Sequence, residues 1–218
     1  MSLCVVIPAY NEEATIVRVI NSVHNYCDCV VVNDNSKDST AVLAKKHGAH
    51  LVSHKSNKGY EASLYSGLTW ARDNGYTRVI TMDGDDQHPY SALSKYDNLL
   101  QNSVSVVFGV RDRKQRFAEI FIAYLTNFMW GIKDPLCGMK GYNIEALNLI
   151  TKDYKQESIG TKFALIPIIQ GYSFSQVKIL TKNRPMGPTR YGDGIKINFF
   201  MISSFIKFFY LTFFISRK

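Results

Sequence analysis

Short apolar runs alternate along the first half of the chain with longer segments in which apolar residues recur every three or four positions. The apolar runs are rich in β-branched residues and predict strands at residues 3–8, 29–33, 50–53, 78–82 and 104–109. The segments between them predict helices at residues 12–26, 39–48, 61–75 and 91–102. Apolar strands separated by helices are typical of a mostly parallel sheet with helices on both faces, so the pattern predicts an α/β fold.

The second half of the chain is less regular. Residues 140–150 and 161–180 predict further helices and strands that complete the same domain. Because no internal repeat or low-complexity linker interrupts the pattern, we expect one domain over residues 1–192 and a separate tail over residues 193–218.

The tail is strongly apolar and aromatic between residues 197 and 215, with Lys207 as its one charge. This length is marginal for crossing a bilayer, and a charge near the middle disfavours simple insertion. Ser203, Ser204 and Lys207 share one helical face, while Phe side chains cover the rest. We therefore expect a hydrophobic membrane-associating helix, either in the interface or spanning with a partner. A helix buried inside the domain is the alternative.

The chain has 218 residues with 26 Lys and Arg against 18 Asp and Glu, a formal net charge of +8. That excess favours a polyanionic partner such as nucleic acid, an acidic membrane surface or a phosphorylated small molecule. Because the basic residues lie among the motifs described below and no nucleic-acid recognition module is apparent, we expect no nucleic-acid partner.

The four cysteines form no C-x-x-C pair and no His tract completes a zinc site, which indicates free thiols in a reducing, cytosolic setting. The first apolar run is too short for a signal peptide and lacks a basic start. With the apolar tail, these features predict a location at the cytoplasmic face of a membrane.

Polar clusters follow several predicted strands at the point where each strand ends: AYNEE, NDNSKDS, DGDDQH and VRDRKQR. In parallel sheets, ligands bind beyond the carboxyl ends of the strands, so these clusters predict the position of a site.

The segment MDGDDQHP, residues 82–89, concentrates acidic groups directly after a strand. Asp83 and Asp85 are two positions apart, so in an extended segment both face one spot, with Gln87 following. Gly84 removes a side chain and lets a ligand or another backbone approach. Such oxygen ligands suit Mg²⁺ or Mn²⁺. The alternative is a solvated acidic loop in which Asp86 caps a helix.

Several motifs in this order resemble glycosyltransferase family 2, whose domain has the GT-A nucleotide-sugar fold, a Rossmann-like arrangement. VVIPAYNEE is similar to the family's opening strand and donor-binding turn, and VVVNDNSKDST to its second motif, with Asn33 in place of the first of two aspartates. NKGYEASLYSGL resembles its Asn-x-Gly helix start, and MDGDDQHP its Asp-x-Asp-x-Gln-x-Pro metal motif. The resemblance covers most of residues 1–192.

Within that family, the chain is most similar to dolichol-phosphate mannosyltransferases and other polyprenyl-phosphate glycosyltransferases. DPLCGMKGYN resembles their Asp-Pro-x-x-Gly-Phe-Arg segment, with Met139 and Lys140 where Phe-Arg is usual. NRPMGPTRYG resembles their Arg-x-x-Gly-x-Ser-Lys motif, in which Arg184 and Arg190 keep the spacing of the basic residues.

The resemblance implies a pocket for a nucleotide-sugar donor (a GDP-mannose or a UDP-sugar). The residues implied to line it are Pro8, Tyr10, Glu12, Val32, Asp34, Asp83, Gly84, Asp85, Arg184 and Arg190. In relatives the counterpart of Asp34 contacts the base. Asp83 and Asp85, with Gln87, would hold the divalent ion that bridges the diphosphate.

The implied catalytic residues are Asp83, Asp85 and Arg111. Arg111, Arg184 and Arg190 would meet phosphate oxygens, although a solvated basic loop is the alternative for Arg111. The implied acceptor-side residues are Asp134, Gly138 and Lys140.

The acceptor decides whether a base is needed. An alcohol must lose a proton, whereas a phosphate monoester with a second pKa of about 6 is already ionised near neutral pH. Sugar-acceptor relatives usually carry a carboxylate where this chain has Gly160, Thr161 and Lys162. Together with these residues, the resemblance implies an inverting, metal-dependent transfer of a hexose to a polyprenyl phosphate at a membrane surface.

Two alternatives remain open. A family member could act on a glycan or lipid-linked saccharide, with Glu157 or Asp134 as the base. The other alternative is a non-catalytic nucleotide-binding membrane scaffold. It stays open because Asn33, Met139 and Lys162 differ from the residues usual at these positions in the family.

Overall fold

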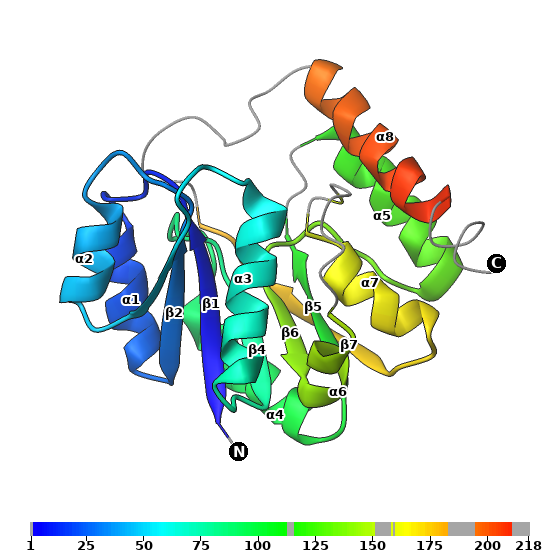
Figure 1. Ribbon diagram of the computed structural model, residues 1–218. Coiled ribbons are helices and arrows are strands. Elements are labelled where there is room, and N and C mark those ends of the chain that lie inside the picture. Colours follow the sequence, from blue (N-terminus) through cyan, green and yellow to red (C-terminus); the bar gives the residue numbers. More distant parts are fainter. Residues whose placement is uncertain (1, 113–115, 151–157, 159, 183–194, 211–218) are drawn as a thin grey trace.

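The computed structural model describes residues 2–112, 116–150, 158, 160–182 and 195–210, and within these residues seven strands form one sheet (Figure 1). The strands are β1 (Leu3–Ala9), β2 (Asp28–Asn33), β3 (His50–Ser53), β4 (Arg78–Thr81), β5 (Val106–Arg111), β6 (Lys140–Asn143) and β7 (Phe174–Ile179). Their order is β3-β2-β1-β4-β6-β5-β7. Strand β6 pairs antiparallel with β4 and β5, and the other neighbours pair in parallel. The predicted mostly parallel sheet is confirmed.

Helices cover both faces of this sheet. One face carries α1 (Ile16–His24), α2 (Thr40–Lys46) and α4 (Leu93–Gln101), which follows a 3₁₀ turn, η1 (Tyr90–Ala92). The other face carries α3 (Tyr60–Asp73), α5 (Phe117–Trp130), α6 (Ile144–Asn148), α7 (Lys162–Ile169) and α8 (Ile195–Tyr210). Because successive strand residues point to opposite faces, Val5 and Ile7 pack under α1, whereas Cys4 and Val6 pack under α3.

Predicted and observed elements agree closely in the first half of the chain, and differ mainly where helices begin. Helix α1 begins at Ile16 rather than near residue 12, because the Glu12 carbonyl accepts hydrogen bonds from the Thr15 and Ile16 amides in a preceding turn. The three buried cysteines, Cys4, Cys29 and Cys137, and the partly buried Cys27 are free thiols.

The apolar tail differs from expectation. Helix α8 packs along α5 (Figure 1), and its Met201, Phe205 and Phe208 side chains are buried in the core cluster on that face. Asn198 accepts a hydrogen bond from the Ala118 amide at 2.9 Å, close to the start of α5. None of the helices in the described part of the chain has both the length and the apolar character that crossing a bilayer requires. The expected C-terminal membrane helix is therefore not found, and residues 195–210 are part of the fold.

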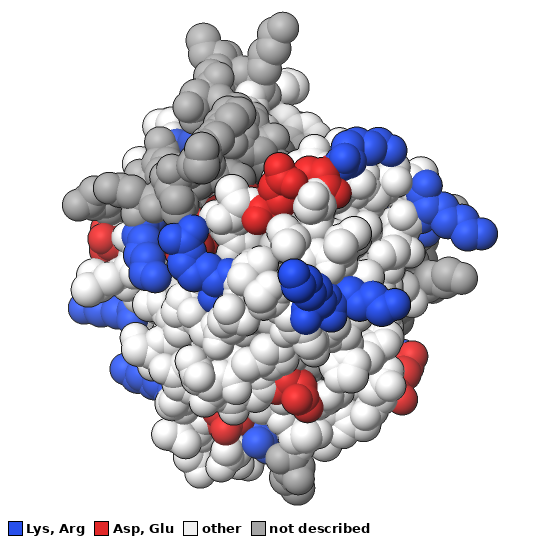
Figure 2. Space-filling view, turned by 90° about the vertical axis from the view of Figure 1, so that its left-hand side faces the viewer, with Lys and Arg blue, Asp and Glu red and all other residues white. Residues whose placement is uncertain are grey.

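Charge is spread over the face that carries α1 and α2. Figure 2 shows the Lys and Arg side chains there in separate groups, with neutral surface and Asp or Glu side chains between them, among the residues drawn in colour. The net charge of +8 is therefore not gathered into one stripe on this face.

Helix α3 approaches β1 and β2 closely at Gly67. A Cβ placed on Gly67 would lie 2.3 Å from Val6 Cγ1 and 3.0 Å from Val32 Cγ2, so the helix can sit this close only because the side chain is missing. This packing sets the distance between α3 and the sheet, and so helps to position the first turn of α3 near the carboxyl ends of the strands.

We expect Gly67→Ala to lower the free energy of unfolding by about 1–3 kcal/mol, because overpacking forces two fully buried valines to move. Urea unfolding followed by circular dichroism measures this change. Val42→Ala on the exposed face of α2 is the matched control and should change stability by less than about 0.5 kcal/mol. Equal stability of the two variants would contradict the close packing of α3.

Candidate active site

The carboxyl ends of β1, β2 and β4 meet at one edge of the sheet. Pro8 on β1 is the register partner of Val32 on β2, and Gly84 in the turn after β4 lies next to Pro8. A Cβ on Gly84 would lie 3.5 Å from the Pro8 carbonyl oxygen and 3.5 Å from Glu12 Cγ, which are ordinary contacts. Thr15 Oγ1 donates to the Gly84 carbonyl at 2.7 Å and fastens this turn to the start of α1. The structure thus brings the predicted donor residues of two motifs together.

Of the three aspartates in the turn, Asp85 and Asp86 are both buried, and Asp86 is in addition neutralised by its neighbours. Its carboxylate accepts a hydrogen bond from Tyr90 Oη at 2.5 Å, and Arg18 Nε and Lys182 Nζ lie at 3.2 and 3.4 Å. Asp86 also has a left-handed backbone, with φ of 62°, which is uncommon outside glycine. It therefore holds the shape of the turn rather than offering a charge to a ligand.

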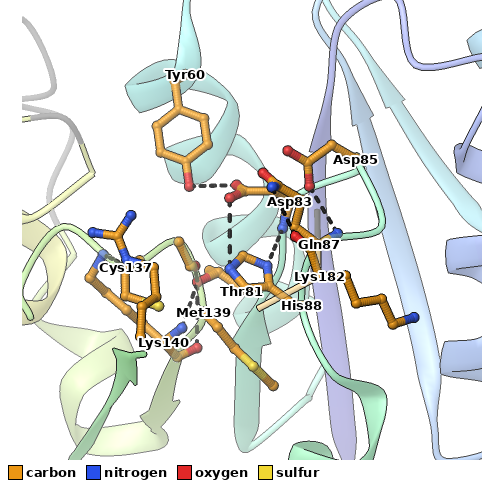
Figure 3. Close-up of polar contacts among 12 residues, drawn as sticks. Tyr60, Thr81, Asp83, Asp85, Gln87, His88, Cys137, Met139, Lys140 and Lys182 are labelled. Carbon is orange, nitrogen blue, oxygen red and sulfur yellow. Dashed lines mark hydrogen bonds and ion pairs between the residues drawn. The ribbon is translucent and has the colours of Figure 1, made fainter. Parts of the chain in front are cut away.

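Asp83 and Asp85 have different surroundings, as Figure 3 shows at the end of β4. Asp85 Oδ1 accepts a hydrogen bond from the Gln87 amide at 3.2 Å. Asp83 Oδ1 accepts one from Tyr60 Oη at 3.0 Å, and the Asp83 amide donates to His88 Nδ1 at 3.3 Å. With Nδ1 as acceptor, the ring proton of His88 is on Nε2, 3.9 Å from Asp83 Oδ2. The Asp83 side chain keeps 35% of its surface exposed, so it faces solvent.

These residues fit a hard divalent cation. Asp83 and Asp85 supply carboxylate oxygens, and the Gln87 amide nitrogen is bound to the Lys182 carbonyl at 3.1 Å, which leaves its oxygen as the atom suited to a metal. Among the residues described, no three His, Cys, Asp or Glu side chains gather into a metal site. A site with two carboxylates leaves further positions for phosphate oxygens and water, the arrangement in which Mg²⁺ is usually bound.

Gly138 lies against Asp83. A Cβ at this position would be 2.3 Å from Asp83 Oδ2, so no other residue leaves the carboxylate in place. The Gly138 carbonyl accepts a hydrogen bond from Thr81 Oγ1 at 2.7 Å, which fastens the segment before β6 to the end of β4. The residue predicted on the acceptor side therefore shapes the candidate metal site.

Asp34, predicted to contact the base, is buried and well bonded. Its Oδ1 accepts hydrogen bonds from His54 Nδ1 at 2.7 Å and the Lys58 amide at 2.8 Å, and its Oδ2 accepts one from the Gly59 amide at 2.8 Å. His54 Nε2 is in turn bonded to Ser66 Oγ at 2.9 Å. Asp34 thus ties β2 to the turn before α3.

The other residues predicted to bind the donor differ in access. Val32 is fully buried and Pro8 is also buried, whereas Tyr10 and Glu12 are partly exposed. Arg184, Arg190 and Glu157 lie outside the described residues.

Arg111 is held by two carboxylates. Its main-chain amide, Nε and Nη2 donate to Asp134 at 3.1, 2.8 and 2.9 Å, and Nη2 lies 3.3 Å from Glu119. Burial alone would lower the pKa of Arg111, but the hydrogen bonds and charge of Asp134 raise it. The guanidinium therefore stays charged. Asp134 is 1% exposed, so it holds Arg111 rather than facing an acceptor.

Lys140 lies behind the site instead of facing solvent. It is 2% exposed, and its Nζ donates to the Cys137 carbonyl at 2.5 Å. Burial lowers the pKa of Lys140, and the charges of Asp134 and Asp83 oppose this effect. Burial also raises the pKa of the Cys137 thiol to about 12. Lys140, predicted on the acceptor side, is therefore buried against the segment before β6 and is not exposed to an acceptor.

Sequence reasoning missed several polar residues of the site: Thr15, His54, Tyr60, Thr81 and His88. Thr15, His54, Tyr60 and Thr81 bond to partners far away in the chain, whereas His88 bonds to Asp83 within the same turn. Tyr60 and His88 lie inside the motifs NKGYEASLYSGL and MDGDDQHP, and that position was the available signal for these two residues.

Removing the charge of Asp134 should destabilise the chain, because Arg111 would keep a buried charge with Glu119 as its remaining carboxylate. We expect Asp134→Asn to lower the free energy of unfolding by about 3–5 kcal/mol. Asp73→Asn breaks an ion pair at an exposed side chain and should cost less than about 0.5 kcal/mol. Urea midpoints measure both, and similar losses would mean that the Arg111 pair is not buried as described.

Comparisons with known proteins agree with this geometry. Residues 4–148 match the profile of Glycosyl transferase family 2. A dolichyl-phosphate hexose transferase of Haloferax volcanii is 29% identical over 84% of this chain and 83% of its own. A polyprenol monophosphomannose synthase of Mycolicibacterium smegmatis is 25% identical over 91% and 84%.

A solved structure has the same fold with more distant sequence. Glucosyl-3-phosphoglycerate synthase from Mycobacterium tuberculosis, in complex with Mn²⁺, UDP and glucosyl-3-phosphoglycerate, superposes with a TM-score of 0.75 at 20% identity, covering 94% of this chain and 79% of that one. The GT-A-like fold expected from the resemblance is thereby confirmed. Because the family profile spans well over half of the sequence, the chain belongs to glycosyltransferase family 2.

Proposed function

We propose that this glycosyltransferase is an inverting, metal-dependent enzyme that transfers a hexose from a nucleotide-sugar to a polyprenyl phosphate. The observation that carries the proposal is the division of charge after β4, where Asp86 is neutralised while Asp83 keeps an exposed carboxylate beside Asp85. Relatives named for polyprenyl-phosphate and dolichyl-phosphate transfer support the acceptor class.

The chemistry needs stabilisation of the departing diphosphate. As the anomeric carbon becomes oxocarbenium-like, negative charge develops on the leaving group. Mg²⁺ or Mn²⁺ held by Asp83, Asp85 and the Gln87 oxygen would supply a positive charge there. The structural neighbour solved with Mn²⁺ and UDP supports the choice of a divalent cation. Arg111 stays charged and is oriented by Asp134, so its guanidinium could donate hydrogen bonds to oxygens of the diphosphate.

A phosphate acceptor fits the surroundings of the carboxylates. Asp134 is buried and bonded to Arg111, which makes it a poor base for a saccharide hydroxyl. Glu61, another carboxylate of this region, is engaged by Ser158 Oγ at 2.7 Å and the Gly160 amide at 2.8 Å. An ionised polyprenyl phosphate needs no base and can attack directly.

Transfer of radiolabelled hexose tests the function. GDP-mannose and UDP-sugars are supplied with Mn²⁺ and a short-chain polyprenyl monophosphate, and the product is identified by chromatography. Label in the lipid phosphate supports the proposal, whereas label in a saccharide acceptor supports the glycan alternative. If the purified chain neither transfers nor hydrolyses any of these donors, the non-catalytic scaffold is favoured.

Asp85→Asn should reduce transfer at least about 100-fold while the fold is kept, because Asn can still accept the Gln87 amide hydrogen bond but loses the charge. Initial rates measured over a range of Mn²⁺ concentrations give the effect. Asp28→Asn, an exposed residue at the start of β2, is the control and should be as active as the original chain. Full activity of Asp85→Asn at saturating Mn²⁺ would reject its role as a ligand.

The proposed membrane contact is the outer face of α5 and α8, which we call the α5–α8 apolar face. Its exposed apolar residues are Phe117, Ile120, Phe121, Tyr124, Phe128, Met129, Phe199, Ile206 and Tyr210. Soluble monomers rarely expose so much contiguous apolar surface without a partner. Lys207 on α8 and Lys133, three residues beyond the end of α5, are exposed, and cations beside apolar side chains suit an anionic lipid surface.

Charged substitutions on this face should weaken vesicle binding. Phe128 is 82% and Tyr124 is 70% exposed, so Phe128→Asp and Tyr124→Asp should leave the fold intact and lower partitioning into anionic vesicles roughly tenfold or more. Val42→Asp, at a 70% exposed position on α2, is the matched control. Co-sedimentation measures the binding. Unchanged binding of the α5 variants, or a loss of self-association instead, would contradict the membrane contact.

A further inference from the structure

Tyr60, the first residue of α3, reaches from the helix start to the candidate metal site. Its Oη donates a hydrogen bond to Asp83 Oδ1 at 3.0 Å, and Figure 3 shows the ring directed toward that carboxylate. Gly138 and His88 border the same carboxylate, with His88 Nε2 3.9 Å from Oδ2. The Asp83 side chain is therefore fixed from several directions while 35% of its surface stays exposed.

The main chain that carries Tyr60 is fixed as well. The two residues before it, Lys58 and Gly59, donate their amides to Asp34 at 2.8 Å each. The residue after it, Glu61, accepts hydrogen bonds from the Ser158 and Gly160 amides at 3.2 and 2.8 Å. Tyr60 thus stands between two residues whose main chain or side chain is held by buried carboxylate hydrogen bonds, which fixes the start of α3 from which its ring extends.

Gly160 makes room for the ring. It has φ of 70°, and a Cβ there would lie 2.8 Å from Tyr60 Cε1 and 2.7 Å from Leu64 Cδ1. A side chain at this position would push against the ring and strain the backbone. The absence of a side chain at Gly160 therefore lets the Tyr60 ring occupy the position from which its hydroxyl reaches Asp83.

We propose that Tyr60 is a positioning residue that orients Asp83 for the divalent cation, and that Gly160 is required for the ring to reach it. Hydrogen bonds from the layer around a metal ligand fix the ligand's orientation, and their loss typically costs about 10–100-fold in metal affinity. The phenol is a suitable donor because its one O–H group occupies a lone pair of Asp83 Oδ1 and leaves the other lone pairs of the carboxylate for the cation. This inference rests on the proposed function, since it concerns the cation of that site.

The test is direct Mn²⁺ binding, measured from the electron paramagnetic resonance signal of free Mn²⁺ with UDP or GDP present. Tyr60→Phe keeps the ring, and we expect its apparent Kd for Mn²⁺ to rise about 10–100-fold with an unchanged unfolding midpoint. Gly160→Ala should shift the Kd in the same direction, and the double variant should be no worse than the weaker-binding single variant. Tyr26→Phe, at a 44% exposed ring near the end of α1, is the matched control.

Activity gives a second readout. High Mn²⁺ should restore transfer by Tyr60→Phe, because Asp83 is still present, but should not restore transfer by Asp83→Asn. Wild-type affinity of Tyr60→Phe for Mn²⁺ overturns the inference alone. If the unmodified chain binds no Mn²⁺ with either nucleotide, the proposed function fails, and the inference fails with it.

Discussion

The buried carboxylate of Asp34 is the point on which the arrangement of the site depends. A buried charge is costly unless hydrogen bonds replace water, and Asp34 receives them from His54 and from the amides of Lys58 and Gly59. Because two of these donors are main-chain groups just before α3, satisfying the charge also fixes where that helix begins. Gly67 then lets α3 lie close against β1 and β2. The position of Tyr60 over the edge of the sheet follows from both constraints.

Around this edge of the sheet, some carboxylates are paired with cations of the protein and stabilise the fold, whereas Asp83, among the residues described, is not. Arg18 and Lys182 neutralise Asp86, and Asp134 pairs with Arg111, so these carboxylates stabilise turns and strand ends. Asp83 receives a neutral hydroxyl instead of a cation, and its charge remains available. An acidic turn of this kind supplies carboxylate oxygens, which suit a divalent cation and, through that cation, a diphosphate.

Helix α8 shows how an apolar segment can serve two purposes. Met201, Phe205 and Phe208 complete the core beside α5, while Phe199 and Ile206 face outward. Joined to the exposed stripe of α5, the outward residues make one apolar face at the end of the molecule away from α1 and α2 (Figure 1). Under the proposed function, this apolar face would contact the bilayer that holds the lipid acceptor.

The sequence by itself determined the strands of the first half, the helices between them, and the acidic and polar groups at the strand ends. The spacing of apolar residues and the point where an apolar run ends depend only on neighbouring residues, so both can be read along the chain. It could not decide which of Asp83, Asp85 and Asp86 keeps a free charge. It also gave no sign that Tyr60 would meet Asp83, or that the tail would pack on α5. Those outcomes depend on contacts between residues far apart in the chain, and only tertiary packing sets which charges are desolvated and which partners come within hydrogen-bonding distance.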